Sequence, residues 1–383
     1  MIDLLQTLIK YDSTTPDQSQ CLDWIANHLN HHGFTIEWFN HQGIRNLYMK
    51  RVGDNPDIVL FTGHTDTVAT GPLSEWTYPP FSCTHKDGYV YGRGMVDMKG
   101  AVAAMIFALT QYNHKHTSVA LLLTSNEEGD ANGNGTEYAV RCLQERGESI
   151  GCIINGEPTS KNKIGDCVKI GRRGSLTANI TLHGKQGHVA YAHLAANPNK
   201  YLIEFLTSCS QHCWSPKDSV SLPTTCEIVE LKSGTGFDNV IPDQASCKIN
   251  WRYTPDCDSD KIKTWVEREL GKHSYDIAWK HSAKPFIASP KKLLNIACAA
   301  IENTTGIQPQ ITCDGGTSDA RFLVDLSNEI IELGLLHQTA HQIDEHTKYT
   351  DVHQLATIYL DIMHQWNHHG QTINHQTTSI GES

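Results

Sequence analysis

Residues 57–66, DIVLFTGHTD, decide the fold class of this chain. The uninterrupted apolar run IVLF is typical of a strand buried on both faces of a parallel sheet. The run leads directly into GHTD, and in open α/β sheets ligands bind beyond the carboxyl ends of the strands. Asp66 follows His64 by two positions, so in an extended chain both side chains point to the same side. The stretch therefore predicts a buried strand that carries His64 and Asp66 to a site at the sheet edge.

Apolar segments on either side of this run alternate between strand and helix. Val119–Thr124 and Cys152–Asn155 have the composition of buried strands, and the alanine-rich stretch Gly100–Tyr112 predicts a helix. From Ser175 the pattern changes to strands with alternating polarity and two helices, which indicates an α+β unit. We therefore predict an α/β fold. A catalytic domain, residues 1–174 and 287–383, has a mixed sheet covered by helices on both faces, and a smaller α+β domain at 175–286 interrupts it.

Composition excludes several classes of protein. The 383 residues carry 31 basic and 42 acidic side chains, a formal charge of −11 without a long basic stripe, which argues against nucleic-acid binding. The longest apolar runs are too short to span a membrane, and the first residues do not resemble a secretory signal. The 12 cysteines form no CxxC pair, so we expect free thiols and a cytoplasmic protein. The polar stretch 368–383 is expected to be mobile.

Acidic residues follow other predicted strands and turns. Asp97 stands after a glycine-rich turn and just before the predicted helix at Gly100, where this stretch taken alone favours an N-cap. Glu127 and Glu128 follow the strand that ends at Thr124; neighbouring residues on an extended chain face opposite ways, so the two acids should have different roles. A solvated acidic turn is the alternative. Glu157 follows the strand that ends at Asn155.

Together these positions predict a metal centre. Imidazole and carboxylate donors without a thiolate suit Zn²⁺, Mn²⁺ or Co²⁺ in a catalytic role. The acids outnumber what one ion needs, which indicates two ions that share a bridging carboxylate. Cys209 and Cys213 flank His212 and imitate a metal cluster, but their spacing fits free thiols better.

The chain resembles the M20 family of zinc-dependent peptidases and deacylases over nearly its whole length. The resemblance is carried by ten segments in order: GHTDTV at 63–68, GRGMVDMKG at 92–100, TSNEEGDA at 124–131, GEPT at 156–159, GRRGSL at 171–176, QGHVAYAHLAANP at 186–198, NVIP at 239–242, NWR at 250–252, DGGTSDARF at 314–322 and TAHQIDE at 339–345. The interrupting domain is then similar to the family's lid and dimerisation domain.

The resemblance implies a role for each residue of the metal centre. His64 would bind one Zn²⁺ and His341 the other, with Asp97 bridging them. Glu128 would complete one site and Glu157 the other, while Glu127 would be the general base and Asp66 would orient His64. Composition alone makes His337 and His346 equal candidates to His341, and only the TAHQIDE motif distinguishes them.

The same resemblance implies a homodimer and a set of substrate contacts. His188 and Asn239 would reach the active site of the partner subunit, where His188 would stabilise the tetrahedral intermediate. The substrate contacts would come from Arg172, Asn239, Arg252, Gly316, Thr317 and Arg321, since arginine suits bidentate carboxylate recognition. Ala192, Ala196 and Asp314 depart from the residues usual in the family at these places.

Within the family, GRRGSL and HVAYAHLAANP are most similar to the desuccinylases. This implies a small-molecule substrate, N-succinyl-L,L-2,6-diaminopimelate, hydrolysed to succinate and L,L-2,6-diaminopimelate, a precursor of lysine and peptidoglycan. The alternatives are a related deacylase such as an acetylornithine deacetylase, an aminopeptidase or carboxypeptidase of the family, and a noncatalytic metal-binding relative. Neither nucleic acid nor a membrane is expected as a partner.

Overall fold

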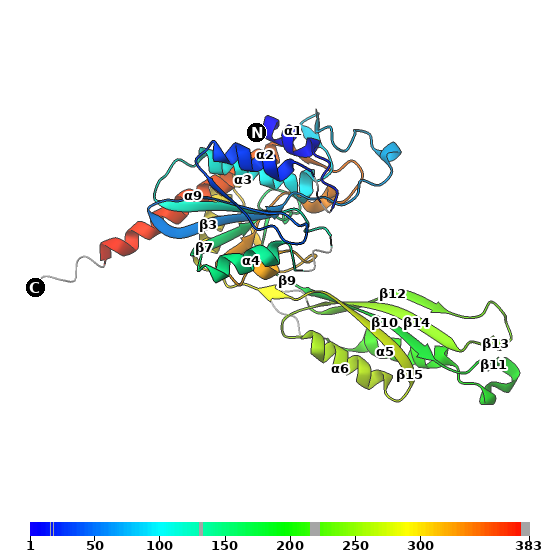
Figure 1. Cartoon of the computed structure of the whole chain (residues 1–383). Helices are drawn as coiled ribbons and strands as arrows, with labels where there is room; N and C mark the ends of the chain where they lie inside the picture. The colour runs from blue at the N-terminus through cyan, green and yellow to red at the C-terminus, as the bar shows by residue number, and fades with distance from the viewer. Residues whose placement is uncertain (16, 18, 130–132, 215–222, 377–383) are drawn as a thin grey trace, which may run out of the picture. The chain divides into compact units, whose positions relative to one another are not determined.

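The computed structural model describes residues 1–15, 17, 19–129, 133–214 and 223–376. By its contacts the chain divides into two compact units (Figure 1). Unit 1 comprises Met1–Ile170, Ala288–Thr312 and Ser318–Ser383, and unit 2 comprises Gly171–Ile287 and Cys313–Thr317. The short segment Cys313–Thr317, which the predicted boundaries place in the catalytic domain, therefore groups with unit 2.

Unit 1 is built around an eight-stranded mixed sheet with the strand order β1-β2-β6-β3-β7-β18-β8-β17. The central strands β6, β3, β7 and β18 run parallel, whereas β1, β2 and β8 form antiparallel pairs with their neighbours toward the centre. The bounds are β1 Thr35–Trp38, β2 Asn46–Arg51, β3 Asn55–His64, β6 Thr117–Thr124, β7 Ile150–Asn155, β8 Cys167–Lys169, β17 Gln310–Thr312 and β18 Ile330–Glu332. A separate three-stranded sheet contains β4 Thr84–Lys86, β5 Tyr89–Tyr91 and β19 His346–Lys348.

Helices cover both faces of the large sheet, so the predicted α/β architecture is confirmed. Val59 and Phe61 of β3 point into a core formed with the helices α1 Ile2–Lys10, α2 Cys21–Asn30, α3 Gly100–Gln111, α7 Lys292–Thr305 and α9 Tyr349–Gln376. Leu60 and Thr62 alternate with them and face the other side, where α4 Thr136–Glu145 and α8 Ala320–Leu323 lie (Figure 1). Because His64 follows Thr62 by two residues, it leaves the sheet on this second face.

The last helix, α9, extends into the polar C-terminal stretch that the sequence predicts to be mobile. It continues to Gln376, and residues 377–383 lie outside the described part of the chain. Among the described residues, no helix combines the length and apolar character that crossing a membrane requires.

Unit 2 contains a four-stranded antiparallel sheet with the order β12-β14-β10-β15. Its core is formed by one face of the sheet and the helices α5 and α6, and includes the fully buried Trp251. The bounds are β10 Gly174–His183, α5 Pro198–Gln211, β12 Thr225–Ser233, β14 Gln244–Tyr253, α6 Ser259–Leu270 and β15 Ser274–Ala283. Smaller elements are β9 Gly171–Arg172, which pairs with β16 Phe286–Ile287, and β11 Gly187–His188, which pairs with β13 Val240–Ile241.

Candidate metal centre

His64 and Glu157 come from neighbouring parallel strands. His64 is the last residue of β3 and Glu157 follows the end of β7, and the two strands are in register with Thr62 opposite Asn155. Both ligand candidates therefore leave the same edge of the sheet on the same face. The side chain of His64 is 1% exposed, and its Nε2 lies 3.7 Å from Glu157 Oε1.

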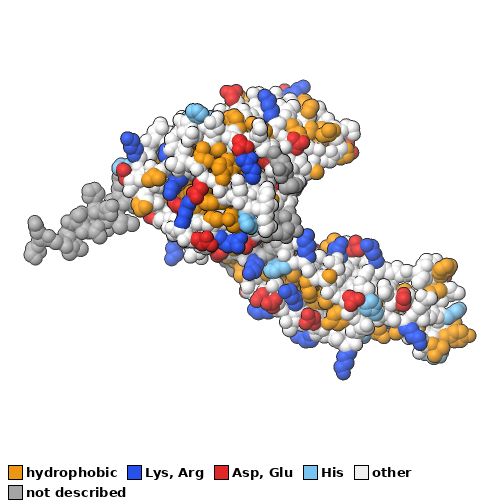
Figure 2. All heavy atoms as spheres, in the orientation of Figure 1, with side chains coloured by type: hydrophobic (Ala, Val, Ile, Leu, Met, Phe, Trp, Pro, Cys, Tyr) orange, Lys and Arg blue, Asp and Glu red, His pale blue; other side chains and the backbone are white. Residues whose placement is uncertain are grey.

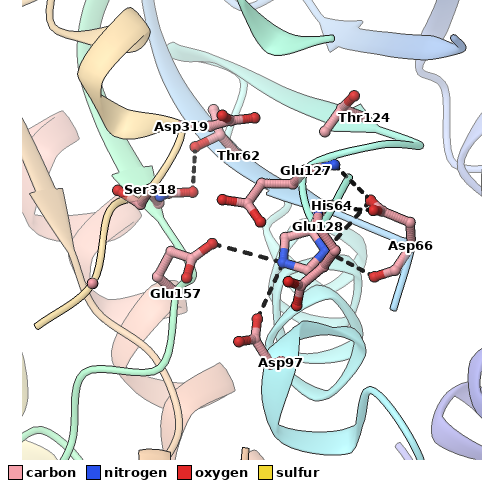
Figure 3. Close-up of polar contacts among 12 residues, drawn as sticks. Thr62, His64, Asp66, Asp97, Thr124, Glu127, Glu128, Glu157, Ser318 and Asp319 are labelled. Carbon is pink, nitrogen blue, oxygen red and sulfur yellow. Dashed lines mark hydrogen bonds and ion pairs between the residues drawn. The ribbon is translucent and has the colours of Figure 1, made fainter. Parts of the chain in front are cut away.

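Asp97 lies between the two histidines of the site. Its Oδ1 lies 3.1 Å from His64 Nε2, and its Oδ2 lies 3.3 Å from His341 Nε2. The N-cap position of α3 is occupied by Lys99 and not by Asp97, so the alternative explanation of Asp97 as an N-cap is wrong. The backbone at Asp97 is non-helical, within the irregular turn Met95–Lys99, and its carboxylate points to the centre instead of capping α3 (Figure 3).

His341 pairs with Glu128 at the same place. His341 Nε2 lies 2.7 Å from Glu128 Oε1. The other two candidates from this histidine-rich region lie elsewhere: His337 is exposed in a short 3₁₀ turn, and His346 packs its ring against Tyr91. The tertiary structure thus brings one of the three histidines to Asp97, a distinction that composition does not make.

Three groups of potential metal ligands occur among the described residues, and their donor atoms lie within 4.8 Å of one another in each group. Two of these groups share Asp97 and have one histidine and one glutamate each. They consist of His64, Asp97 and Glu157, and of Asp97, Glu128 and His341. This set fits two divalent cations with a bridging carboxylate, because each group offers one imidazole and two carboxylates without a thiolate.

The third group consists of His64, Glu127 and Glu128. Glu127 therefore lies near the centre, although it is not part of the two groups that share Asp97. Together with Thr62 of β3 and Asp319, the residue before α8, it lines a small cavity beside His64. The two neighbouring glutamates thus occupy different surroundings, although they lie in a bend and not on the extended chain that the sequence predicts.

The charges in the site perturb one another strongly. Burial alone lowers the pKa of His64, but its hydrogen bond to Asp97 and the nearby charges of Asp66 and Glu127 outweigh this and raise the pKa well above the usual value. Burial raises the pKa of Glu127 well above its usual range, and the carboxylate of Glu157 adds to the shift. Burial also disfavours the charge of Asp97, yet the hydrogen bonds from His341 and His64 leave its pKa below the usual value. Such crowding of acids favours a cation between them.

Asp66 contacts the site differently from the expectation. The Nδ1–H of His64 donates to the backbone carbonyl of Asp66 at 2.9 Å, whereas the nearest carboxylate oxygen is 3.6 Å away. The carboxylate instead accepts hydrogen bonds from the backbone N–H groups of Glu127 and Glu128, each at 2.9 Å (Figure 3). Asp66 therefore fixes the tautomer of His64 through its carbonyl and holds the acidic loop through its side chain.

A row of hydrogen-bonded, buried polar side chains crosses the sheet two residues before the ligand candidates His64 and Glu157. Thr62 Oγ1 donates to Asn155 Oδ1 at 3.0 Å, Asn155 donates to Glu332 Oε1 at 3.4 Å, and the hydroxyl of Ser318 donates to the same oxygen. Sequence reasoning missed Asn155 and Glu332. Each is a polar residue at the end of an otherwise apolar strand. Because a buried polar group needs a hydrogen-bond partner, this pattern could have predicted that they lie near other polar groups.

Most of the predicted substrate contacts lie in unit 2. His188 and Asn239 lie close together, because His188 of β11 pairs with Val240 of β13 and Asn239 directly precedes β13. Both residues are exposed. The Nδ1 of His188 accepts a hydrogen bond from the backbone N–H of Ala190 at 3.0 Å. In the neutral ring the proton is then on Nε2, which makes that atom an outward hydrogen-bond donor.

The predicted arginines are divided between the units. In unit 2, Arg172 donates to the carbonyl of Gly316 at 3.1 Å, which fixes the turn that also contains the half-buried Thr317. Arg252 lies on β14 opposite Ser175. In unit 1, Arg321 lies 3.5 Å from Asp319 in an ion pair.

Comparison with known proteins places the whole arrangement in one family. The profile of peptidase family M20/M25/M40 matches residues 60–365. A metallo-carboxypeptidase of the M20 family from Sulfolobus solfataricus has a similar structure, with 17% identity, a TM-score of 0.77, and coverage of 95% of this chain and 98% of that chain. The aminopeptidase PepT from Bacillus cereus gives 18% identity and a TM-score of 0.75, with coverage of 95% and 97%.

A third similar structure carries information on metal content. It is the YXEP protein of Bacillus subtilis, a dinuclear metal-binding peptidase of the M20 family, with 13% identity, a TM-score of 0.67, and coverage of 96% of this chain and 98% of that chain. At such low identities these structures show a common fold. The matched profile spans most of the chain, including all the ligand candidates described above. The protein is therefore a hydrolase that belongs to the peptidase family M20/M25/M40.

Proposed function

We propose that the protein hydrolyses the amide bond of N-succinyl-L,L-2,6-diaminopimelate and releases succinate and L,L-2,6-diaminopimelate. The observation that carries amide hydrolysis is the pair of ligand groups that share Asp97, with Glu127 beside them at the same sheet edge. The choice of substrate rests on the GRRGSL and HVAYAHLAANP segments of the sequence and on the arginines near them.

Two Zn²⁺ ions per subunit are the proposed cofactors, with Co²⁺ or Mn²⁺ as possible substitutes. His64 and Glu157 would hold one ion, Glu128 and His341 the other, and Asp97 would bridge them. When bound, such ions supply Lewis-acid polarisation of the acyl carbonyl and acidify a water molecule.

Glu127 is the proposed general base. Burial and the charge of Glu157 raise its pKa well above the usual value, which brings a carboxylate closer to the proton affinity that general base catalysis needs near neutral pH. Glu127 would accept a proton from the attacking water and return it to the leaving amine. The carbonyl of Asp66 keeps the Nε2 lone pair of His64 directed at the centre during these steps.

The arginines would bind the carboxylates of the substrate. N-succinyl-L,L-2,6-diaminopimelate has three carboxylates, and a guanidinium binds a carboxylate through two parallel hydrogen bonds. Arg172 is nearly buried and fixed on the carbonyl of Gly316, so its position is defined before the substrate arrives. Arg252, Arg321, Asn239 and Thr317 are the other proposed contacts.

A homodimer is the proposed assembly, with His188 and Asn239 acting in the partner's active site. Large exposed hydrophobic side chains support it: Phe237 is 72% exposed, and Val189, Tyr191 and Leu194 are more than half exposed. Figure 2 shows hydrophobic side chains at the end of unit 2 that carries β11 and β13. Exposed apolar patches of this kind mark association surfaces.

Subunit mixing tests this assembly. The variants His188→Ala and Glu127→Gln should each be inactive alone, and mixed subunits should recover activity, because a mixed dimer contains one active site with both residues intact. Light scattering should give twice the mass of the chain. A monomeric active enzyme, or mixtures without recovery, would contradict the dimer.

The decisive experiment measures succinate release from N-succinyl-L,L-2,6-diaminopimelate. We expect release that stops after treatment with a chelator and returns when Zn²⁺ is added. Glu127→Gln protein serves as the control for a contaminating hydrolase, since it should bind metal but not turn over. Failure to release succinate in a chelator-sensitive way would refute the proposal.

A peptidase is the second candidate, because the structures compared above include a carboxypeptidase and an aminopeptidase. Acetylornithine deacetylase activity is a further candidate within the same reaction class. Parallel assays with unblocked dipeptides, N-acetylornithine and the succinylated substrate would distinguish these activities by their relative kcat/KM.

The cytoplasm is the proposed location. Buried free thiols occur in both units, for example Cys21 and Cys152 in unit 1 and Cys209 and Cys247 in unit 2. Free thiols persist in a reducing compartment. Fractionation of cells that express the protein would test this location.

A further inference from the structure

Glu345 is a fully buried carboxylate in unit 1, with an exposed fraction of 0%. Its Oε2 accepts hydrogen bonds from Arg93 Nη1 at 2.8 Å and from the Gly94 N–H at 2.9 Å. Its Oε1 accepts from the N–H groups of Val96 at 2.7 Å and Asp97 at 3.1 Å. Among the described residues, Glu345 is in none of the three ligand groups, so its four contacts serve the loop and not a metal.

The loop that Glu345 holds has no regular structure of its own. Gly94 has a φ of +78°, and Asp97 and Met98 have non-helical backbone angles within the turn. A side chain at position 94 would also collide with Thr67, because a Cβ there would lie 2.5 Å from its Cγ2. Three amides of this turn, those of Gly94, Val96 and Asp97, find their acceptor outside it in Glu345, and buried amides without an acceptor are rare.

Glu345 also belongs to the segment that carries His341. Both His341 and Asp344 have a positive φ, so this segment turns sharply between the ligand and Glu345. Arg93 joins the two segments a second time, since its Nη1 donates to the carbonyl of Gln342 at 3.1 Å. The ion pair therefore connects the Asp97 turn directly to the His341 turn.

We propose that Glu345, paired with Arg93, is a positioning residue that sets the spacing between Asp97 and His341 and so determines the affinity of the metal position formed by Asp97, Glu128 and His341. This inference rests on the metal centre of the proposed function. His64 ends β3 and Glu157 follows β7, and these two strands are hydrogen-bonded to each other. The position formed by His64, Asp97 and Glu157 should depend on Glu345 much less.

The test is a Zn²⁺ titration of metal-free protein against a chromophoric chelator. Wild-type protein should bind two ions. Glu345→Gln should bind one ion with near wild-type affinity and the second at least ~10-fold more weakly, the range in which loss of an outer-shell contact affects metal affinity. Glu345→Asp, which keeps the charge, should recover part of the second affinity.

A matched control is available at the opposite edge of the sheet. Glu329 precedes β18 and accepts hydrogen bonds from the N–H groups of Lys291, Lys292 and Leu293 at 2.8–3.2 Å, where α7 begins. Glu329→Gln removes the same kind of carboxylate–amide contact without touching the metal centre. Both metal affinities of this variant should stay within about twofold of the wild type, although the variant should be less stable.

Folding of each variant is checked by circular dichroism and thermal unfolding. If Glu345→Gln does not fold, Glu345→Asp and Arg93→Lys are tested in its place. Each should lower the affinity for the second ion only. The inference would be overturned if folded variants kept both affinities, or if both affinities fell by the same factor. It would also be overturned if Glu329→Gln lowered the second affinity as much as Glu345→Gln does. This test measures metal binding and not succinate release. Binding of two ions by the wild type and selective loss of the second affinity would therefore support the inference even if the substrate is different.

Discussion

His64 and Glu157 reach the metal centre from regular strands, whereas Asp97 and His341 reach it from irregular turns. The first pair inherits its position from backbone hydrogen bonds, because β3 and β7 lie in register beside each other. The second pair lies in turns next to the paired strands β5 and β19, where the side chains of Glu345 and Arg93 hold the irregular backbone. Glu128 belongs with the second pair because its loop is held by the Asp66 carboxylate.

This difference predicts which metal position a substitution should weaken. A strand-borne ligand keeps its place when a neighbouring side chain changes, because the ladder of backbone bonds is unaffected. A loop-borne ligand moves when the buried acid that holds its loop is replaced. The two metal positions should therefore respond differently to distant changes, although they share Asp97.

Asp97→Ala should have the largest effect, because it removes the one ligand that both positions share. We expect loss of both ions and a fall in kcat/KM of at least ~10⁴-fold, since the Lewis acid and the positioned water are lost together. Metal content after dialysis and initial rates measure this. A variant that retains one tightly bound ion would contradict the bridging role.

Glu127→Gln should separate chemistry from metal binding. We expect a fall in kcat of ~10³-fold, within the usual range for loss of a general base, with both ions retained. Metal analysis of the same preparation provides the control. Turnover close to that of the wild type would show that Glu127 is not the base.

Glu128→Ala and Glu157→Ala should each remove one ion, and the comparison identifies which position is loop-borne. We expect the affinity for that ion to fall by at least ~100-fold, beyond the effect of outer-shell changes. Combining Glu345→Gln with each variant sharpens the contrast. The double variant with Glu157→Ala should lose both ions, whereas the one with Glu128→Ala should keep the remaining ion.

The pH dependence of stability in the metal-free protein should give the smallest effect. Hydrogen bonds from His341 to Asp97 and Glu128 raise the pKa of His341 from 6.5 to about 10. A raised pKa means that the folded state holds the proton more tightly, so this stabilisation is complete below pH 6.5 and is lost as the pH rises to 10.

Urea unfolding in the presence of a chelator measures this dependence. The free energy of unfolding should fall between pH 6.5 and 10, and His341→Ala should make the fall less steep. The side chain of His341 is 47% exposed, so salt should weaken the effect. An identical slope in the variant would refute the assignment.

Parts of the site could be predicted from the sequence because they follow regular patterns. The apolar runs that end at His64 and before Glu157 place both residues at the carboxyl ends of buried strands. Glu332 was not predicted as a neighbour of Asn155, because it lies 177 residues later in the chain, on β18. Glu345 was likewise missed, since neither hydrophobic periodicity nor ligand spacing marks a residue that binds only backbone amides.

The sequence by itself determined the α/β class and the set of imidazole and carboxylate donors, because both depend on local patterns of residue type. Only the tertiary structure decided which donors pair, with Glu157 beside His64 and Glu128 beside His341. It also decided that Asp66 and Glu345 act on backbone amides. The physical reason is that these contacts join segments far apart in the chain, and their geometry is fixed only when the sheet and its loops are packed together.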